Sequence, residues 1–362
     1  MRGSWFIDCT IRVVTMLIEE LDQSAFAQWD EYLGRNNQST CYHHLAWQSV
    51  ARRAYRLRTH YLLARNEIGT ICGALPLVEV RGLVHAHLTN GLFGAYAPAL
   101  GDTQEIRAEL LRRAFELARE RRVQYFVVKT VGSDQGRVMD EFVELNSWVI
   151  AVLKLDSDPE RLWHGLRDKV RNCVRKAQKA GLEVRRGKEY LASFYDVLAE
   201  NMHRKGSPIY GFNFMKELMS AFGDKAEIVT LWHEGRVVSG ALTLDHGRTT
   251  AVPFASSRPS ALHMSPNNLL YWDIIRRSCE KGMTAFDFGR SLRNSGPLSF
   301  KLGWGSDIVE QPFFIRTVKG DDFEMSSNKR RADWFVDRWK RLPRSVADAL
   351  GPAVCRQVAG LL

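Results

Sequence analysis

Two stretches of the chain carry the same pattern: LARNEIGTICGALPL at residues 63–77 and LWHEGRVVSGALTL at residues 231–244. When Gly73 is set on Gly240, Glu67 falls on Glu234 without a gap. Each copy is an apolar run, a turn rich in Asn, Gly or charge, and a second apolar run, which predicts an antiparallel β-hairpin. A hairpin that recurs in this way indicates two related halves.

A helix and a short strand follow each hairpin in the same order. Apolar residues at three- or four-residue spacing predict helices over residues 106–121 and 269–281. Each helix leads into a short apolar strand, at residues 125–128 and 285–288. Hairpin, helix and strand therefore occur twice, which predicts an α/β chain with mixed sheets and two tandem domains.

A further amphipathic pattern separates the halves. Inward apolar residues predict one helix over 162–180, with Gly181 as its stop and a strand over 182–185. We therefore place the domain boundary near residue 150. The expected segments are an N-terminal tail (1–10), a first domain (11–150), a second domain (151–320) and a basic amphipathic helical tail (321–362).

Composition narrows the class of protein. The apolar fraction of 45% and the charged fraction of 25% are those of a globular chain. The sequence has no apolar run long enough to span a membrane and no secretory signal, so we expect a cytoplasmic protein. Six cysteines occur singly, as reduced thiols would. The pair His43 and His44 has no further ligands at metal-binding spacing, so we expect no metal.

Positive charge is concentrated around the predicted helix at 162–180. Residues 161–188 contain ten Lys or Arg against Asp168 and Glu183. A solvated helix face and an anion-binding surface explain this surplus about equally well. As a binding surface, the row would contact phosphates in a groove between the domains; it comprises Lys169, Arg171, Arg175 and Lys176. No RNA-recognition signature accompanies it.

Two motifs of the second half carry candidate chemistry: Asp287-Phe-Gly289-Arg290 and Phe300-Lys301-Leu-Gly-Trp304-Gly305. Gly289 would permit a close approach of backbone or ligand, and Arg290 would bind a phosphate or carboxylate. Asp287 is either the structural partner of Arg290, which is the favoured role, or a proton acceptor for an attacking amine. Lys301 would place a compact charge on an anion or a developing oxyanion.

With these motifs the sequence resembles the FemAB-like family over residues 29–317, whose members carry two GNAT-like (BioF2-like) acyltransferase domains. Within that family it is similar to the branch associated with PEP-CTERM and exosortase loci. The supporting motifs are His43-His44-x-x-Trp47, Gly206-Ser-Pro-Ile-Tyr210, Asn267-Asn268-Leu-Leu-Tyr271-Trp272 and Leu350-Gly-Pro352.

The resemblance implies roles for particular residues. Lys301 matches the lysine thought to meet the phosphate end of a charged tRNA donor, which makes Lys301 and Asp287 the candidate catalytic residues. Asn268 and Trp304 are implied as substrate contacts. Tyr210 is either an acceptor contact or a loop tyrosine that covers the core. The Arg/Gln-x-x-Gly-x-Gly/Ala turn that binds coenzyme A is absent, so we expect no tightly bound cofactor; the donor is left open between aminoacyl-tRNA and an acyl-CoA or acyl carrier.

The C-terminal tail mixes Trp334, Phe335 and Trp339 with basic residues, ahead of Pro343 and a short helix over 346–350. It would either contact the inner face of a membrane or pack against the second domain, and the second reading is favoured because Gly351 and Pro352 interrupt the pattern.

The function expected is transfer of an acyl or aminoacyl group to an amine on a phosphate-bearing envelope precursor, either a peptidoglycan or an exopolysaccharide intermediate. The alternatives are a non-catalytic scaffold protein with the same fold and a tRNA-binding protein without transfer activity. No covalent nucleophile is evident, because neither a Gly-x-Ser-x-Gly motif nor a Cys–His pair is present.

Overall fold

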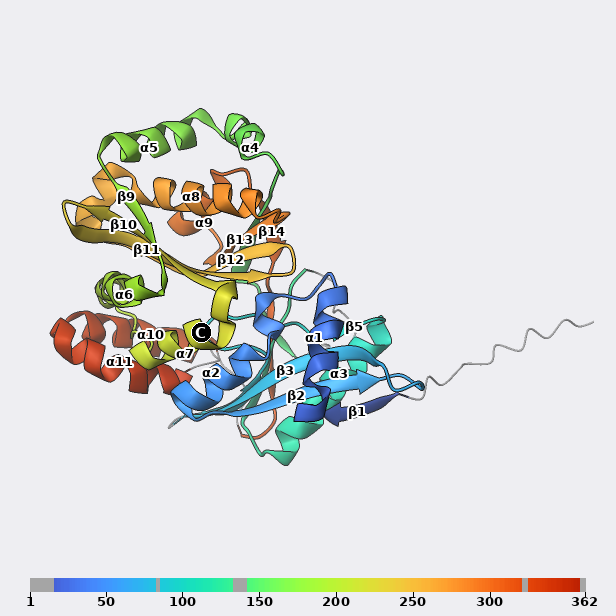
Figure 1. Cartoon of the computed structure of the whole chain (residues 1–362). Coiled ribbons are helices and arrows are strands. Elements are labelled where there is room, and N and C mark those ends of the chain that lie inside the picture. Colours follow the sequence, from blue (N-terminus) through green and yellow to red (C-terminus); the bar gives the residue numbers. More distant parts are fainter. Residues whose placement is uncertain (1–15, 83–84, 133–141, 321–324, 359–362) are drawn as a thin grey trace, which may run out of the picture.

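The computed structural model describes residues 16–82, 85–132, 142–320 and 325–358. The chain forms two mixed sheets, one in each half, and helices cover both of them (Figure 1). The predicted α/β class with two related domains is confirmed. The predicted tail at residues 1–10 lies outside the described residues.

The first sheet contains eight strands in the order β1-β2-β3-β4-β6-β15-β7, with β5 paired to β3. Its strands are β1 (Leu17–Glu20), β2 (Arg58–Arg65), β3 (Ile71–Arg81), β4 (Ala86–Thr89), β5 (Leu100–Gly101), β6 (Tyr125–Lys129), β7 (Val143–Leu145) and β15 (Phe313–Thr317). Its helices are α1 (Phe26–Arg35), α2 (Ala46–Tyr55) and α3 (Gln104–Glu120).

The second sheet contains seven strands in the order β14-β8-β13-β12-β11-β10-β9. They are β8 (Trp148–Lys154), β9 (Glu183–Arg186), β10 (Ala226–His233), β11 (Arg236–His246), β12 (Thr249–Ser257), β13 (Ala285–Leu292) and β14 (Asp307–Glu310). Its helices are α4 (Pro159–Gly165), α5 (Asp168–Lys179), α6 (Leu191–Lys205), α7 (Phe212–Phe222), α8 (Pro266–Glu280) and α9 (Gly296–Leu302).

Both quoted stretches form the predicted hairpins. Gly73 of β3 pairs with Ala64 of β2, and Gly240 of β11 pairs with Thr230 of β10. A Cβ atom on Gly73 would lie 2.6 Å from Ile106 of α3, and one on Gly240 would lie 2.8 Å from the ring of Phe194 in α6. The shared glycine therefore lets a helix pack directly on the hairpin in each domain.

Each sheet contains one parallel pair that opens partway along its length. In the second sheet, residues 249–251 of β12 pair with residues 285–287 of β13, and the pairing ends there. In the first sheet, residues 87–89 of β4 pair with residues 125–127 of β6. Asn90 fills this opening, because its side-chain amide donates to the Lys129 carbonyl (2.7 Å) and accepts from the Lys129 N–H (2.7 Å). Val252, at the matching position of β12, makes no such bridge.

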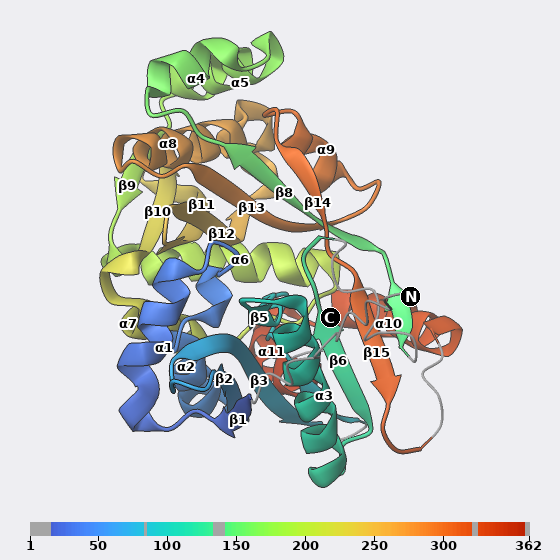
Figure 2. The same cartoon turned by 90° about the vertical axis from the view of Figure 1, so that its right-hand side faces the viewer.

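The two sheets exchange strands, which the sequence did not indicate. Strand β8 pairs with β13 and β14 of the second sheet, although it begins before residue 150. Strand β15 pairs with β6 and β7 of the first sheet, although it lies near the end of the range 151–320. Figure 2 shows the chain crossing between the domains at β8 and again between β14 and β15. The ranges expected for the domains therefore do not separate the sheets.

The helix predicted over residues 162–180 is two helices, α4 and α5. Leu166 and Arg167 leave helical geometry, with ψ angles of 149° and 142°. Leu166 is buried in the apolar cluster that α8 shares with the second sheet. The single-helix prediction was wrong because Gly165, a poor helix former, ends α4 and Leu166 turns into the core at the break.

The C-terminal helices α10 (Met325–Lys340) and α11 (Arg344–Val358) pack against α6, and α11 also contacts β3 of the first domain. His203 of α6 donates to the Leu342 carbonyl at 2.9 Å, and Trp339 is buried. The favoured packing of the tail is confirmed, but the short helix at 346–350 was wrong, because α11 continues through Gly351 and Pro352. Gly351 has no side chain that would collide with Ile209.

Among the described helices, none is long and apolar enough to cross a membrane.

Gly240→Ala should lower the free energy of unfolding by roughly 1–3 kcal/mol, because the added methyl group collides with the buried ring of Phe194. The matched control is Gly34→Ala in α1, where no atom lies within 4 Å of the new methyl group. That substitution should stabilise by about 0.5–1 kcal/mol. Urea unfolding of both variants is the measurement, and equal shifts of the same sign would contradict the packing described for Gly240.

Candidate active site

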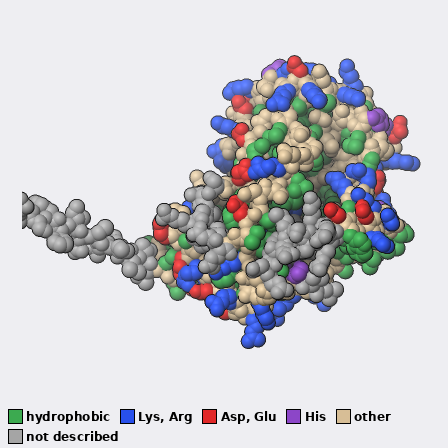
Figure 3. Space-filling view, turned by 180° about the vertical axis from the view of Figure 1, so that it is seen from behind, with side chains coloured by type: hydrophobic (Ala, Val, Ile, Leu, Met, Phe, Trp, Pro, Cys, Tyr) green, Lys and Arg blue, Asp and Glu red, His purple; other side chains and the backbone are tan. Residues whose placement is uncertain are grey.

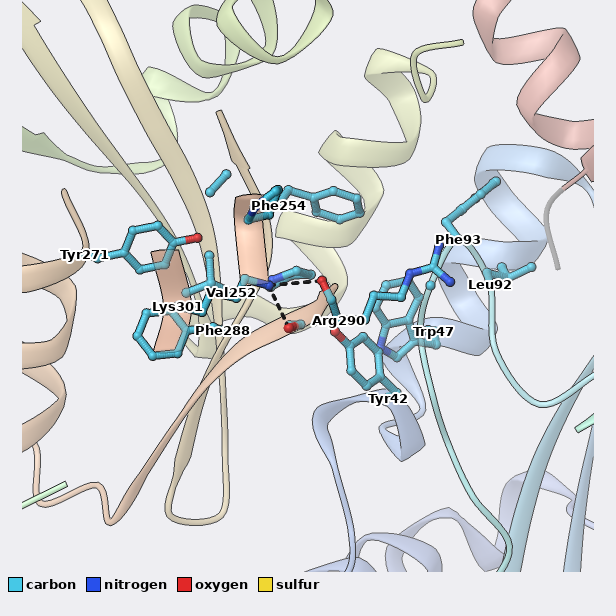
Figure 4. Close-up of a pocket in the computed structure, with 16 residues that line it drawn as sticks. Tyr42, Trp47, Leu92, Phe93, Val252, Phe254, Tyr271, Phe288, Arg290 and Lys301 are labelled. Carbon is cyan, nitrogen blue, oxygen red and sulfur yellow. Dashed lines mark hydrogen bonds between the residues drawn. The ribbon is translucent and has the colours of Figure 1, made fainter. Parts of the chain in front are cut away.

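A cavity of about 240 Å³ lies where β12 and β13 diverge, and both domains form its walls (Figure 4). The second domain contributes Tyr271, Phe288, Gly289, Arg290, Pro297, Lys301 and residues 252–255. The first domain contributes Tyr42, Trp47 and residues 92–95. The walls are mainly apolar and aromatic, with two cationic side chains among them, as is typical of small-molecule sites.

A bulge in β13 shapes one wall of this cavity. The pairing of β13 with β8 shifts between Asp287 and Arg290, so that two residues of β13 lie opposite one residue of β8. Gly289 has φ +74°, a left-handed conformation that side chains with a Cβ rarely adopt. The Asp287 carboxylate accepts the Gly289 N–H at 2.7 Å and holds the bulge from within.

Lys301 lies on α9, whose first turn is capped by the Ser295 hydroxyl. Its ammonium donates to the carbonyls of Gly289 (2.7 Å) and Arg290 (3.0 Å), which leaves one N–H for a ligand in the cavity (Figure 4). Burial lowers the pKa of Lys301 to about 8, with nearby Asp287 opposing this shift and Arg290 adding to it. Lys301 is thus both a support of the bulge and a buried cation.

Asp287 connects the two domains. Tyr96 of the first domain donates a hydrogen bond from its hydroxyl to the Asp287 carboxylate, and both side chains are buried. Burial raises the pKa of Asp287, against the effect of its hydrogen bonds to Tyr96 and Gly289. The favoured pairing of Asp287 with Arg290 was wrong: Asp287 faces Tyr96 and a second cavity of about 350 Å³ between the domains.

Arg290 reaches across the interface into the first domain. Its guanidinium lies 4.1 Å from the centre of the Trp148 ring and against Gly94, where a Cβ atom would collide with it. Its Nη1 is buried without a hydrogen-bond partner. Within the part of the chain that the structure describes, no carboxylate forms an ion pair with Lys301 or Arg290. The cavity therefore has a surplus of positive charge, which favours an anionic ligand.

Three other candidates lie around the cavity without lining it. The ring of Tyr210 packs on Phe93 and Phe254, which do line it, so Tyr210 supports the wall. Trp304 is buried and packs on Phe288 and Phe300. Asn268 lies in the first turn of α8, one turn before Tyr271.

The basic row is remote from this cavity. Helix α5 packs on α8 at the far side of the second domain, away from the first domain (Figures 1 and 2). The side chains of Lys169, Arg175 and Lys176 are exposed, and Arg171 is paired with Asp168. In the space-filling view, Lys and Arg side chains gather at this upper end of the molecule (Figure 3). The prediction that the row follows a groove between the domains was wrong.

First-domain residues of the site were not recognised from the sequence. Tyr42 lies in the 3-10 helix Cys41–His43, and Phe93 and Tyr96 lie in a turn and a loop. No motif distinguishes these three residues from core aromatics. Only Trp47 fell within a quoted motif. The histidines beside it have structural contacts: Nδ1 of His43 accepts from the Thr40 N–H at 3.0 Å, and the ring of His44 stacks on Phe222.

Comparison with known proteins identifies the second domain. Residues 164–302 match the acetyltransferase (GNAT) domain family. The second domain therefore has the fold of a GNAT acetyltransferase domain. No curated protein matches the chain.

Solved structures extend the likeness to both domains. The crystal structure of FemX shares 14% identity with a TM-score of 0.65, covering 82% of this chain and 96% of that one. A tandem GNAT protein from the clavulanic acid biosynthesis pathway shares 14% identity at a TM-score of 0.54, covering 85% and 100%. L-PGS from Bacillus licheniformis shares 13% identity at 0.56, covering 90% and 99%. At these identities the likeness concerns the fold, which is that of two GNAT-like domains.

The lowered pKa of Lys301 predicts a pH dependence of stability. In the unfolded chain the lysine keeps its ordinary value of 10.5, so between about pH 8 and 10.5 the unfolded state holds a proton that the folded state has released. Stability contributed at this site should therefore rise with pH in that window, with a slope approaching about 1.4 kcal/mol per pH unit.

The measurement is chemical denaturation of the wild type and Lys301→Met from pH 7 to 10.5. The difference in unfolding free energy between the two proteins should change across the window in favour of the wild type. A pH-independent difference would contradict the buried, destabilised ammonium.

Proposed function

We propose that this protein transfers an acyl or aminoacyl group to an amine on a phosphate-bearing cell-envelope precursor, and that transfer takes place in the cavity between the domains. The observation that carries the proposal is the pair of cations in the β12–β13 opening, Lys301 and Arg290, which form no ion pair with a carboxylate among the described side chains. The GNAT match of residues 164–302 supports a transferase.

The geometry suits stabilisation of negative charge. In the reaction, the amine attacks the carbonyl carbon of an activated ester or thioester, and negative charge develops on the carbonyl oxygen. The C–O or C–S bond to the carrier then breaks, the amine loses a proton, and the carrier leaves as a hydroxyl or thiol while the amide forms. The free N–H of Lys301 and the unpartnered Nη1 of Arg290 would each donate to that oxygen or to a neighbouring phosphate. Aromatic side chains, including Trp47 and Phe254, line the cavity, and the lower polarizability of such walls relative to water would strengthen these interactions.

Asp287 is the candidate proton acceptor. Burial raises its pKa, which makes its carboxylate a stronger base than an exposed one. It lines the second cavity rather than the one that holds Lys301. The proton lost by the attacking amine would therefore reach Asp287 only if the amine approaches from that second cavity.

The donor proposed is a large phosphate-bearing carrier rather than free acetyl-coenzyme A. In GNAT enzymes the coenzyme A pyrophosphate binds a glycine-rich turn at a helix N-terminus. Here the segment before α8 is a 3-10 helix over Pro259–Met264 and contains no glycine. The resemblance to the FemAB-like family supports an aminoacyl-tRNA donor. The resemblance to its PEP-CTERM branch supports an acceptor from an exopolysaccharide pathway.

A scaffold function without transfer is the second candidate. Two of the three N–H groups of Lys301 are occupied by backbone carbonyls, and Asp287 is occupied by Tyr96 and Gly289. A protein that only binds a phosphate-bearing precursor would need the same cations and no free base. Peripheral membrane contact through the exposed Trp334 of α10 fits either candidate.

The test is mass spectrometry of envelope precursors from cells with and without the protein. The account predicts that a precursor loses an acyl or amino-acid mass increment when the protein is absent. Lys301→Ala or Arg290→Ala should fail to restore the increment, whereas the control Lys169→Ala, on the remote α5 row, should restore it.

Variants must first be shown to fold, by circular dichroism and thermal unfolding. Full restoration by folded Lys301→Ala and Arg290→Ala would overturn the proposed site. If cells that lack the protein show an altered envelope phenotype but unchanged precursor masses, the scaffold function would be favoured.

A further inference from the structure

Lys129, at the end of β6, is a buried cation that the proposed chemistry does not use. Its side chain is fully buried, and its ammonium donates to the Gly91 carbonyl at 3.0 Å and lies 5.3 Å from the centre of the Phe313 ring. No carboxylate in the described ranges pairs with it. Burial, and then the charge of Arg290, hold the pKa of Lys129 well below its ordinary value.

Uncompensated polar side chains lie on the same face of the first sheet. His87 and Thr89 of β4 pair in register with Tyr125 and Val127 of β6, so they share the face from which Lys129 projects. Both are fully buried, and neither His87 ring nitrogen nor the Thr89 hydroxyl has a hydrogen-bond partner. Burial, and then the charge of Lys129, lower the pKa of His87 to about 3.

Arg290 and Gln311 border this cluster on the side of the second domain. The Arg290 guanidinium lies 6.0 Å from the centre of the same Phe313 ring that Lys129 approaches. Gln311 is two residues from Phe313 and fully buried, and neither atom of its amide has a partner. Because Arg290 also lines the interdomain cavity, the cluster and the cavity share one side chain.

The cluster lacks a negatively charged hydrogen-bond acceptor. Two of its unpartnered groups can only donate: the remaining N–H groups of Lys129 and Nη1 of Arg290. The Thr89 hydroxyl, the Gln311 amide and the His87 ring can each donate one further hydrogen bond or accept one. A buried charge without a counter-charge destabilises the fold, and so does each buried polar group that lacks a hydrogen bond. Water would satisfy the hydrogen bonds but not the charge, whereas an anion with several acceptor oxygens would satisfy both.

We infer that Lys129, Arg290, His87 and Thr89 form a phosphate-binding site on the first-domain side of the interface. A phosphate offers acceptor oxygens in several directions and up to two negative charges, which matches donors from three strands better than a planar carboxylate does. This inference deepens the proposed function and rests on it only for the identity of the molecule that carries the phosphate. The two anion-binding places would share Arg290, so one substrate phosphate would lie on each side of that guanidinium.

The experiment is calorimetric titration of the intact chain with inorganic phosphate, inorganic pyrophosphate and acetate. Lys129→Met keeps the length of the side chain and removes its charge, and it should weaken phosphate binding at least tenfold. Without phosphate, the same variant should unfold at a higher temperature than the wild type, by at least about 2 °C, because the unpaired charge is gone. The matched control, exposed Lys169→Met on α5, should change neither quantity. Thr89→Val is a second variant that removes one donor at constant shape, and it should weaken binding several-fold.

The outcomes separate this site from the proposed function. Phosphate binding that is unchanged in both Lys129→Met and Thr89→Val overturns the inference, as does a wild type that binds acetate but not phosphate. Binding that is lost only in Lys301→Met also overturns it, yet leaves the transferase proposal intact. Binding that is lost in Lys129→Met supports the site even if the precursor masses show no transfer. A stronger response to pyrophosphate than to phosphate indicates a diphosphate that spans Arg290.

Discussion

The bulge at Phe288 and Gly289 is the constraint on which the rest of the site depends. Because two residues of β13 face one residue of β8, the carbonyls of Gly289 and Arg290 turn toward the Lys301 ammonium. The same distortion aims the Asp287 carboxylate at Tyr96 of the first domain and releases the Arg290 side chain to cross the interface. A regular β-strand would direct its carbonyls to neighbouring strands and would leave none for the Lys301 ammonium.

The two domains differ at the gap between their diverging parallel strands, which is open between β12 and β13 and closed between β4 and β6. Register places Lys129 of β6 at the position of Gly289 in β13, and Asn90 at the position of Val252. In the first domain the Asn90 amide bridges the diverging strands, and the Lys129 ammonium donates to the Gly91 carbonyl. The first domain therefore contributes one wall of the cavity in the second domain. The exchange of β8 and β15 between the sheets fixes the relative position of the two domains.

Patterns that depend on local sequence were predicted well, and features that depend on tertiary contacts were not. The repeat around Gly73 and Gly240 predicted both hairpins and the order of the following elements, because alternation and turn chemistry act within a few residues. Lys301, Gly289 and Arg290 could be selected because they occur in compact motifs. The exchange of strands between the sheets could not be predicted, because the sequence of a strand does not determine which sheet it pairs with. Tyr42 and Tyr96 escaped notice because their roles arise only when the domains meet. The basic row on α5 was wrongly placed beside the interdomain groove, because a concentration of charge in the sequence does not indicate which part of the fold the side chains face.

The central claim is that the opening between β12 and β13 is a phosphate-binding cavity shared by both domains. A crystal structure of the protein with bound inorganic pyrophosphate tests it most directly. The account predicts a ligand within hydrogen-bond distance of the Lys301 ammonium and the Arg290 guanidinium, with first-domain residues such as Tyr42 beside it. Pyrophosphate ordered only on the exposed row of α5, with none in the cavity at saturating concentration, would contradict the account.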